Sequence, residues 1–328
     1  MYKLAVFCLL IAKSLAQNCS LPNVSALVQR RIDSEGEIVS FDDKIQLAED
    51  AFYLLVNQSL LPSLCQGSVK ILDELSIIQI RNCSLMEIEP DAFDITPTLS
   101  LLKISYNPLA MLKKGIFRKV RSKEIDLSHN AITSIEEGTF SNSTWLEIVR
   151  LSYNAIKKLD PDWFLDTPNL YKLSVIYNEL TVVPSAAFQN LAKNRSLKLR
   201  LSANMISRVE EDAFAGVGNI RNLWMNGNKL RTLPESLFQN RTIDLLEVNS
   251  NKLLCFPDSI YLSDLKRLEF FDNRHFSCEC LQEVRNFVEE RLVEVWYPAI
   301  ICENATRGVN IVYNLNRTYE IPLLTPSN

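Results

Sequence analysis

Glycine and histidine are scarce in this chain of 328 residues, which contains 8 glycines and 2 histidines. Phosphate-binding loops need closely spaced glycines, so the sequence offers little material for a nucleotide site. Only His129 and His275 are available for acid–base catalysis or metal ligation, and no zinc-protease or calcium-loop signature occurs. The 35 Lys and Arg residues do not exceed the 39 Asp and Glu residues, which disfavours a nucleic-acid partner. The composition therefore argues against an enzyme, a cofactor site and a metal site.

The first 16 residues predict a secretory signal peptide. Lys3 precedes an apolar run over residues 4–12, and Ser14 and Ala16 supply small residues for cleavage before Gln17. The run is too short to cross a bilayer, and no later stretch reaches that length, so we expect no membrane span. The expected product is secreted and extracellular, with 33 basic and 39 acidic residues after cleavage.

Nine Asn-x-Ser/Thr sequons agree with this location, because N-linked sugars belong to secreted chains and occupy their surfaces. Two of the nine are Asn18 and Asn82. We expect sugars at the other seven, which are Asn23, Asn57, Asn142, Asn194, Asn240, Asn304 and Asn316.

A repeat of 22–26 residues runs through most of the chain. Residues 75–85 read L-x-x-L-x-L-x-x-C-x-L, with Ile allowed for Leu, and a polar anchor recurs at the position of Cys83. The later anchors are Asn107, Asn130, Asn154, Asn178, Asn204, Asn228, Asn251 and Asn273. A phenylalanine lies ten residues after seven successive anchors, from Phe93 to Phe238. The anchors and the phenylalanines thus form two columns, that is, residues that recur at fixed positions of successive repeats. Two such columns with the same spacing indicate a stack of similar structural units.

The pattern resembles that of the leucine-rich-repeat family over residues 50–302. The L-x-L core of each repeat is expected to form a short strand, with side chains such as Leu102 and Ile104 pointing inward. The anchor amide can satisfy turn backbone groups, and the phenylalanines fill the convex side. Because one repeat cannot bury its apolar face alone, neighbours stack into one core. The resemblance implies an α/β leucine-rich-repeat solenoid, a horseshoe of nine to ten repeats with a parallel β-sheet on the concave face and disulfide-stapled caps.

Four segments follow from this pattern. We expect a signal peptide over 1–16, an N-terminal cap over 17–50, leucine-rich repeats over 51–273, and a cysteine-containing C-terminal cap and tail over 274–328. Within the last segment, an amphipathic helix is expected with Leu281, Val284, Val288, Leu292 and Val295 on its apolar face.

The C-terminal cysteines resemble the cysteine-rich cap of extracellular leucine-rich-repeat proteins, which begins with C-x-C before a helix. The fourth cysteine of that cap, expected after Cys302, is missing. By register Cys255 lies beside Ser277 and can replace it. We expect the bonds Cys278–Cys302 and Cys255–Cys280, while the exchange Cys255–Cys278 with Cys280–Cys302 stays open.

One of the cysteines nearer the N-terminus is expected to remain outside the disulfides. With Cys8 removed, seven cysteines remain, and an even subset should pair in a secreted chain. Cys19–Cys65 would close the N-terminal cap. Cys83 is then a buried, inert thiol, or it forms a disulfide with a partner chain, or it bonds Cys19 and frees Cys65.

Ligand binding in this architecture is expected on the concave strand face. An aromatic row occupies the position before four adjacent anchors, and a basic centre of Arg150, Lys172, Lys198 and Arg200 lies beside it, followed by acidic Glu247 and Glu269. Aromatic residues with polar tips suit protein recognition. An alternative is that L-S-Y-N is an ordinary repeat filling. A sugar on Asn82 would shield the N-terminal end of this face. The candidate ligand contacts are Tyr106, His129, Tyr153, Tyr177, Arg150, Lys172, Arg200 and Trp224.

The leading hypothesis is a secreted recognition protein that binds a protein or pathogen-surface ligand on its concave face in innate immunity. The L-S-Y-N repeats and short N-terminal cap resemble the secreted leucine-rich immune proteins of insects, notably mosquitoes. The alternative is an adhesion or developmental signalling protein of the extracellular matrix. Catalysis is not expected, since the serines at 105, 128, 152 and 202 lack a base and an orienting group.

Overall fold

The computed structural model describes residues 23–30, 35–47, 51–72, 74–193 and 195–295, and the backbone of three later strands. Two compact units divide the chain. Unit 1 comprises residues 1–156 and 160–173, and unit 2 comprises residues 157–159 and 174–328. The expected signal peptide, Cys19 and the sequons Asn18, Asn194 and Asn316 lie outside the described residues, as do the side chains of Cys302 and Asn304.

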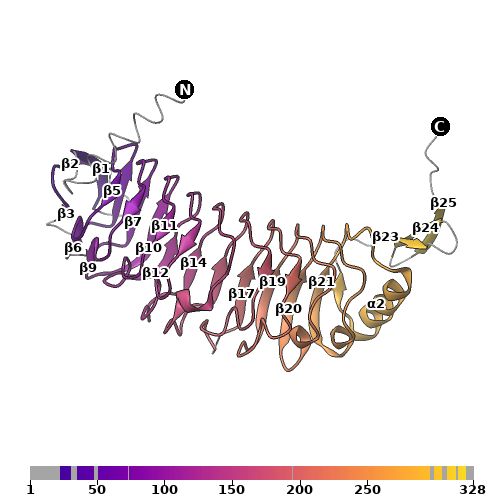
Figure 1. Ribbon diagram of the computed structural model, residues 1–328. Helices are drawn as coiled ribbons and strands as arrows, with labels where there is room; N and C mark the ends of the chain where they lie inside the picture. Colours follow the sequence, from indigo (N-terminus) through magenta and orange to yellow (C-terminus); the bar gives the residue numbers. More distant parts are fainter. Residues whose placement is uncertain are drawn as a thin grey trace. The chain divides into compact units, whose positions relative to one another are not determined.

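Unit 1 is built on a sheet with one strand per repeat, in the order β2-β1-β4-β7-β10-β12-β14 (Figure 1). The pairs from β4 to β14 are parallel. Alternate side chains are buried in β4, β7 and β14 and at Leu102 and Ile104 of β10, which confirms the expected L-x-L pattern. The strands are β1 Val24–Gln29, β2 Glu37–Phe41, β4 Tyr53–Asn57, β7 Ile77–Arg81, β10 Thr98–Ser105, β12 Arg121–Asp126 and β14 Ile148–Arg150.

An antiparallel pair closes the N-terminal edge of this sheet. β1 pairs antiparallel with both β2 and β4, and it buries Val24, Ala26 and Val28 in alternation. A stack of parallel coils would otherwise expose an apolar edge. The expected N-terminal cap therefore contains a hairpin-like pair that the repeat pattern did not predict.

Short strands and turns, in place of helices, return the chain behind the sheet of unit 1. They form three parallel groups, β3-β6-β9, β5-β8 and β11-β13. Their bounds are β3 Ile45–Leu47, β5 Ser63–Leu64, β6 Val69–Ile71, β8 Glu87–Ile88, β9 Phe93–Ile95, β11 Met111–Leu112, β13 Ser134–Ile135, and the 3-10 helix η1 Pro161–Phe164. These segments contribute to the phenylalanine column, since Phe93 lies in β9 and Phe164 in η1.

Phenylalanine rings fill the core at regular intervals. In unit 1, Phe117 and Phe140 are buried with ring centroids 5.4 Å apart, and Phe140 and Phe164 repeat that spacing. In unit 2, Phe188 and Phe214 are buried with centroids 5.3 Å apart. The second column of the sequence pattern is thereby confirmed as core.

Unit 2 continues the same design with a parallel sheet ordered β17-β19-β20-β21-β22 (Figure 1). β15 (Lys172–Ser174) contains the boundary between the units in the chain. The remaining elements are β16 Val182–Val183, β17 Leu197–Arg200, β18 Arg208–Val209, β19 Ile220–Trp224, η2 Glu235–Phe238, β20 Thr242–Glu247, η3 Asp258–Leu262, β21 Asp264–Glu269, α2 Cys278–Arg291, β22 Glu294–Val295, β23 Ala299–Asn304, β24 Val309–Asn314 and β25 Arg317–Pro322.

Each anchor asparagine joins two coils through buried hydrogen bonds. The Oδ1 of Asn204 accepts from the Leu180 N–H at 3.1 Å, and its Nδ2 donates to the carbonyls of Val175, Leu201 and Ser202. Asn228 and the other described anchors of unit 2 repeat the arrangement. These bonds satisfy turn backbone groups that would be costly to bury unpaired.

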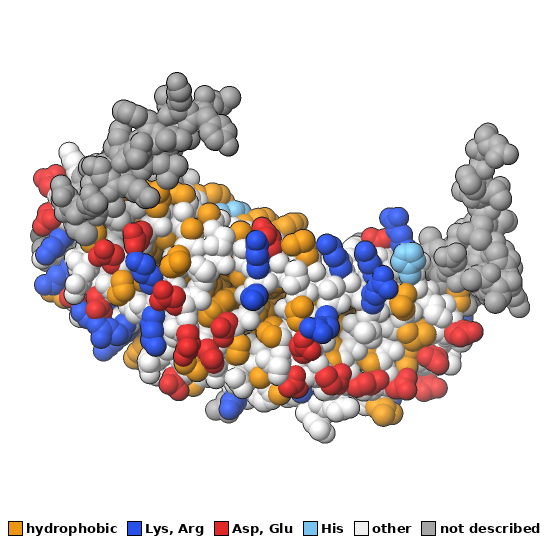
Figure 2. Space-filling model, in the orientation of Figure 1, with side chains coloured by type: hydrophobic (Ala, Val, Ile, Leu, Met, Phe, Trp, Pro, Cys, Tyr) orange, Lys and Arg blue, Asp and Glu red, His pale blue; other side chains and the backbone are white. Residues whose placement is uncertain are grey.

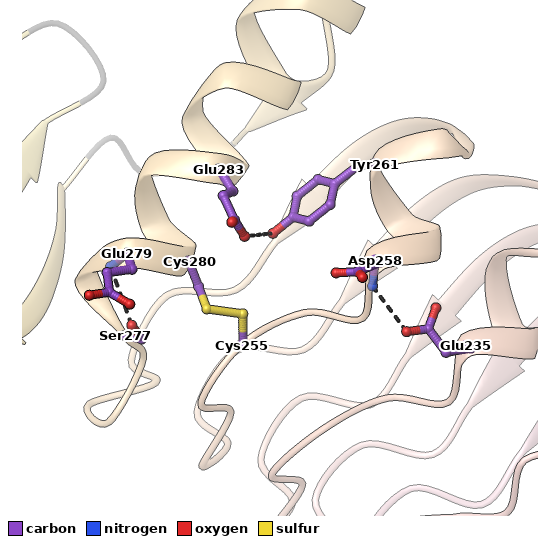
Figure 3. Close-up of a disulfide and its surroundings, with 8 residues drawn as sticks. All are labelled: Glu235, Cys255, Asp258, Tyr261, Ser277, Glu279, Cys280 and Glu283. Carbon is purple, nitrogen blue, oxygen red and sulfur yellow. Dashed lines mark hydrogen bonds between the residues drawn. A yellow bond between two sulfur atoms is a disulfide. The ribbon is translucent and has the colours of Figure 1, made fainter.

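A disulfide and a capped helix end the sheet core of unit 2 (Figure 3). The Ser277 Oγ accepts from the Glu279 N–H at the start of α2, and Cys280 bonds Cys255 with 5.5 Å between Cα atoms. This confirms Cys255–Cys280 and removes the exchanged pairing. Cys65 and Cys278 are also in disulfides. Their expected partners, Cys19 and Cys302, lie outside the described side chains.

The apolar face of α2 differs from the expected one in its last turn. Leu281, Val284 and Phe287 are buried, whereas Leu292 is 88% exposed and ends the helix with φ of 54°. A left-handed residue terminates a helix and turns its side chain away from the previous face. Among the described residues α2 is the single α-helix, and none of their helices is long and apolar enough to span a membrane.

Candidate functional site

The aromatic row of unit 1 forms a stack of three rings. The centroids of Tyr106 and His129 lie 4.6 Å apart at an interplanar angle of 11°, and those of His129 and Tyr153 lie 4.2 Å apart at 10°. Tyr106 and Tyr153 are 54% and 46% exposed. The structure therefore brings three of the sequence-predicted site residues into one surface.

These residues lie just past the strands and not on them, which differs from the sequence interpretation. Tyr106, His129 and Tyr153 have φ of 57°, 58° and 56°, in the left-handed region that non-glycine residues seldom adopt. Main-chain bonds hold this conformation, since the Tyr106 N–H donates to the His129 carbonyl and the His129 N–H to that of Ser152. The ring stack is thus imposed by backbone bonds between coils.

Ion pairs neutralise two basic residues on the strand face of unit 1, the side of the sheet turned away from its core. Arg150 forms a short ion pair with Glu124, and the Lys103 Nζ lies 2.6 Å from Asp126 Oδ2. The hydrogen bond from Arg150 to Glu124 raises the pKa of Arg150. Arg150 is therefore not a free cation for a ligand. Lys172 is half-buried on β15.

The Asp126 pair predicts a loss of stability in acid. Burial alone would raise the pKa of Asp126, but hydrogen bonds from Lys103 and Ser128 outweigh it and lower that pKa. A carboxyl with a lowered folded-state pKa stabilises the fold above its unfolded pKa of about 3.9, and this contribution is lost as pH falls through the folded pKa. Asp126→Asn should destabilise the chain by about 1 kcal/mol at pH 7 and flatten the melting-temperature profile below pH 4. Asp244→Asn, which removes an exposed pair with Lys266, is the control. An unchanged acid profile for Asp126→Asn would contradict the prediction.

Unit 2 contains a hollow of about 270 Å³ on its strand face. It lies over β17, β19 and the end of β20. Its lining residues are Ile176, Tyr177, Arg200, Ser202, Ala203, Trp224, Asn226 and Glu247. Three sequence-predicted contacts, Tyr177, Arg200 and Trp224, thus line one cavity.

The hollow exists because the aromatic column stops. Tyr177 occupies the left-handed position before its anchor, and the next two residues at that position are Ala203 and Gly227. Neither has a side chain that extends as far as a ring. This cavity was not predicted from the sequence, because only the large side chains at this position were considered. The signal in the sequence is the change from large to small residues there.

A ladder of three side chains forms one wall of the hollow. Arg200, Trp224 and Glu247 are register partners on β17, β19 and β20. The Arg200 guanidinium lies 4.6 Å from the centroid of the Trp224 ring, and the Trp224 Nε1–H donates to Glu247 Oε1 at 2.5 Å. This cation–π contact and hydrogen bond hold both planar groups in place.

The charged ends of the ladder have unused hydrogen-bonding capacity. No group in the described part of the chain accepts a hydrogen bond from the Arg200 guanidinium, so the N–H groups of this side chain are available to a ligand. Burial, followed by the negative charge of Glu269, raises the pKa of Glu247. The hollow therefore combines aromatic faces, a cation and a carboxylate within one small space.

Cys83 is an inert buried thiol. Its side chain has no exposed area, and the thiol donates to the carbonyls of Val56 and Arg81. Burial raises the pKa of Cys83, which disfavours the reactive thiolate. The expected alternative of a disulfide to a partner chain would require this coil to open. Cys255, Cys280 and Glu283 also come close enough for a metal ion, but the two sulfurs are joined to each other.

The described sequons differ in exposure. Asn23, Asn142 and Asn240 are exposed, as an occupied site must be. Asn57 is partly exposed on the strand face of unit 1, and its Oδ1 accepts from Asn82 Nδ2 at 3.1 Å. Glycosylation of all seven chosen sites stays a prediction.

Comparison with known proteins gives the same architecture. Residues 144–200 match the leucine rich repeat family, and residues 175–262 match the BspA type leucine rich repeat region. The structure of the mouse RP105/MD-1 complex superposes with a TM-score of 0.56 at 20% identity, over 76% of this chain and 47% of that chain. The fold is a leucine-rich-repeat solenoid.

The matches to sequence relatives cover only part of this chain and part of each relative. Leucine-rich repeat-containing protein 3B of Danio rerio is 33% identical over 84 residues, which is 25% of this chain and 33% of that protein. Toll-like receptor 9 of Mus musculus is 28% identical over 152 residues, which is 45% of this chain and 14% of the receptor. The chain thus spans a third or less of the length of these relatives.

Proposed function

We propose that this chain is a secreted recognition protein of innate immunity that binds a protein or pathogen-surface ligand on its strand face. The hollow in unit 2 is the observation that carries the proposal. It presents Tyr177, Trp224 and Arg200 together, and Trp, Tyr and Arg are the residues that dominate binding energy at protein interfaces. A preformed aromatic and charged site needs little ordering when a partner arrives.

The assignment to innate immunity is supported by the sequence relatives and by the features that indicate secretion. Toll-like receptor 9 is among the sequence relatives, and the repeats resemble those of secreted leucine-rich immune proteins of insects. The apolar N-terminal segment, the sequons and the disulfides support secretion. Transcript levels that rise on infection are expected, whereas constant, tissue-restricted expression would favour an adhesion or developmental role in the extracellular matrix.

A protein ligand is favoured over a nucleic acid by charge. Figure 2 shows basic and acidic side chains interspersed on the face in view, with acidic ones gathered along its lower edge toward α2. Nucleic-acid affinity depends on a basic surface that neutralises phosphates. The acidic residues Glu247 and Glu269 beside the hollow oppose such contacts.

The test is affinity capture by the secreted chain from the body fluid that bathes it, followed by mass spectrometry. The double variant Arg200→Ala/Trp224→Ala should lose at least tenfold of the captured protein, because it removes the cation–π ladder from the hollow. Secretion and thermal unfolding report whether the variant folds.

Lys229→Ala is the matched control, because it removes an exposed cation that does not line the hollow. It should capture as the parent does. Equal capture by a folded double variant would refute the proposed site, and no specific capture by the parent chain would refute the function.

A further inference from the structure

We infer that the hollow of unit 2 receives an aromatic side chain of a protein partner, which stacks on Tyr177 in the place that Ala203 leaves empty. The inference rests on the proposed function and specifies the chemistry of its site. It follows from the contrast between the filled aromatic column of unit 1 and the interrupted column of unit 2.

The stack in unit 1 shows how a ring is oriented at the left-handed position before an anchor. Tyr106, His129 and Tyr153 share one left-handed conformation, and their rings lie nearly parallel at 4.6 and 4.2 Å. Each ring therefore presents its face to the residue at the same position of the next coil.

Tyr177 has the same conformation but no ring after it within unit 2. Its φ is 53°, and its N–H donates to the Ser202 carbonyl just as that of His129 donates to Ser152. The residue that follows at this position is Ala203, with φ of 52° and only a methyl group. Tyr177 is 53% exposed, so one side of this ring position is open to a ligand.

The gap has room for a stacked ring. Ala203 and Gly227 leave two successive positions of the column without a large side chain. Neighbouring coils lie roughly 4.8 Å apart, which suits the centroid separation of about 4.5 Å between stacked aromatic rings. A ring at the position of Ala203 can therefore stack on Tyr177, as the rings of unit 1 stack on one another.

The surrounding polar groups select a ring with a polar tip. The unused N–H groups of Arg200 offer donors, and the Glu247 carboxylate offers an acceptor. Tyrosine and tryptophan can bond such groups, whereas phenylalanine would leave them without partners. A nucleobase could also stack, but its phosphates would meet Glu247 and the adjacent Glu269, which are register partners. These carboxylates favour a protein aromatic.

The experiment measures binding of N-acetyl-L-tyrosinamide to the full-length secreted chain by ligand-observed NMR. N-acetyl-L-leucinamide and uridine monophosphate are compared at the same concentrations. The tyrosine probe should receive the strongest saturation transfer, centred on its ring protons. Ala203→Tyr should raise its dissociation constant at least tenfold, because the chain's own ring then fills the gap.

Two features keep the variant interpretable. Tyrosine already occupies this left-handed position at Tyr106, Tyr153 and Tyr177, so Ala203→Tyr should fold with an unchanged melting temperature. Gln58→Tyr is the matched control, since Gln58 has the same conformation with φ of 54° but lies in unit 1 and is exposed. Gln58→Tyr should leave the affinity for the probe unchanged.

The outcomes separate this inference from the function on which it rests. Equal probe binding by the parent and Ala203→Tyr, or a stronger signal from leucinamide or the nucleotide, overturns the inference. Capture of the same protein by the parent and by Ala203→Tyr also overturns it, while leaving the recognition function standing. If the parent captures no protein, the proposed function fails whatever the probe shows.

Discussion

Asn204→Ala should lower the free energy of unfolding by about 3–4 kcal/mol, among the largest losses that one substitution produces in this chain. The buried side chain satisfies the Leu180 N–H and three carbonyls from two coils. Alanine removes all four bonds and leaves the buried Leu180 N–H without a partner, while the three carbonyls keep their bonds from Asn178, Asn228 and the Tyr177 N–H. Urea denaturation followed by circular dichroism measures the change.

The control for this substitution is Asn219→Ala. Asn219 is exposed, and its single side-chain bond accepts from the Thr242 N–H at 3.0 Å. Because water replaces that bond, the loss should be about 1 kcal/mol or less. Equal losses for Asn204→Ala and Asn219→Ala would show that buried anchors do not hold the coils together.

Replacing Cys255 and Cys280 together with serine should cost about 3.5 kcal/mol, the chain-entropy value for closing a loop of this length. The two cysteines are separated by 25 residues, and their bond joins the last coils to α2. Figure 3 places a hydrogen bond from Tyr261 to Glu283 on the same helix, which the loosened helix would also lose. The midpoint of guanidinium unfolding, followed by circular dichroism, measures the loss.

Cys83→Ala is the matched control, because it removes a cysteine without removing a disulfide. It leaves only a small cavity in the core, so the expected loss is about 1 kcal/mol. A double serine variant as stable as Cys83→Ala would contradict a stabilising role for the bond to α2.

The repeat architecture was predictable because two sequence columns report it directly. Most inward positions of the coils are apolar, the anchor asparagines share one role, and the phenylalanines repeat similar core contacts. The same register placed Cys255 beside the C-x-C pair, and the structure decided between Cys280 and Cys278 as its partner. A periodic fold repeats its physical signal, so errors in one repeat are corrected by the others.

The remaining features depend on single residues or on pairs between coils. Arg150 looked like a free cation until the parallel register placed Glu124 beside it, 26 residues earlier in the chain. The antiparallel pair β1–β2 lies before the repeats and has no copy elsewhere to reveal it. The hollow arises from the absence of large side chains, which a pattern of present residues does not display.

At the left-handed position before each anchor, the backbone conformation does not depend on which side chain is present. Main-chain bonds to the next coil hold its backbone in most coils, and asparagine, tyrosine, histidine, alanine, glycine, serine and aspartate occupy it. The side chain there is therefore exchangeable without a change in the scaffold. Substitutions at this position can thus change which ligand the surface binds while the fold stays the same.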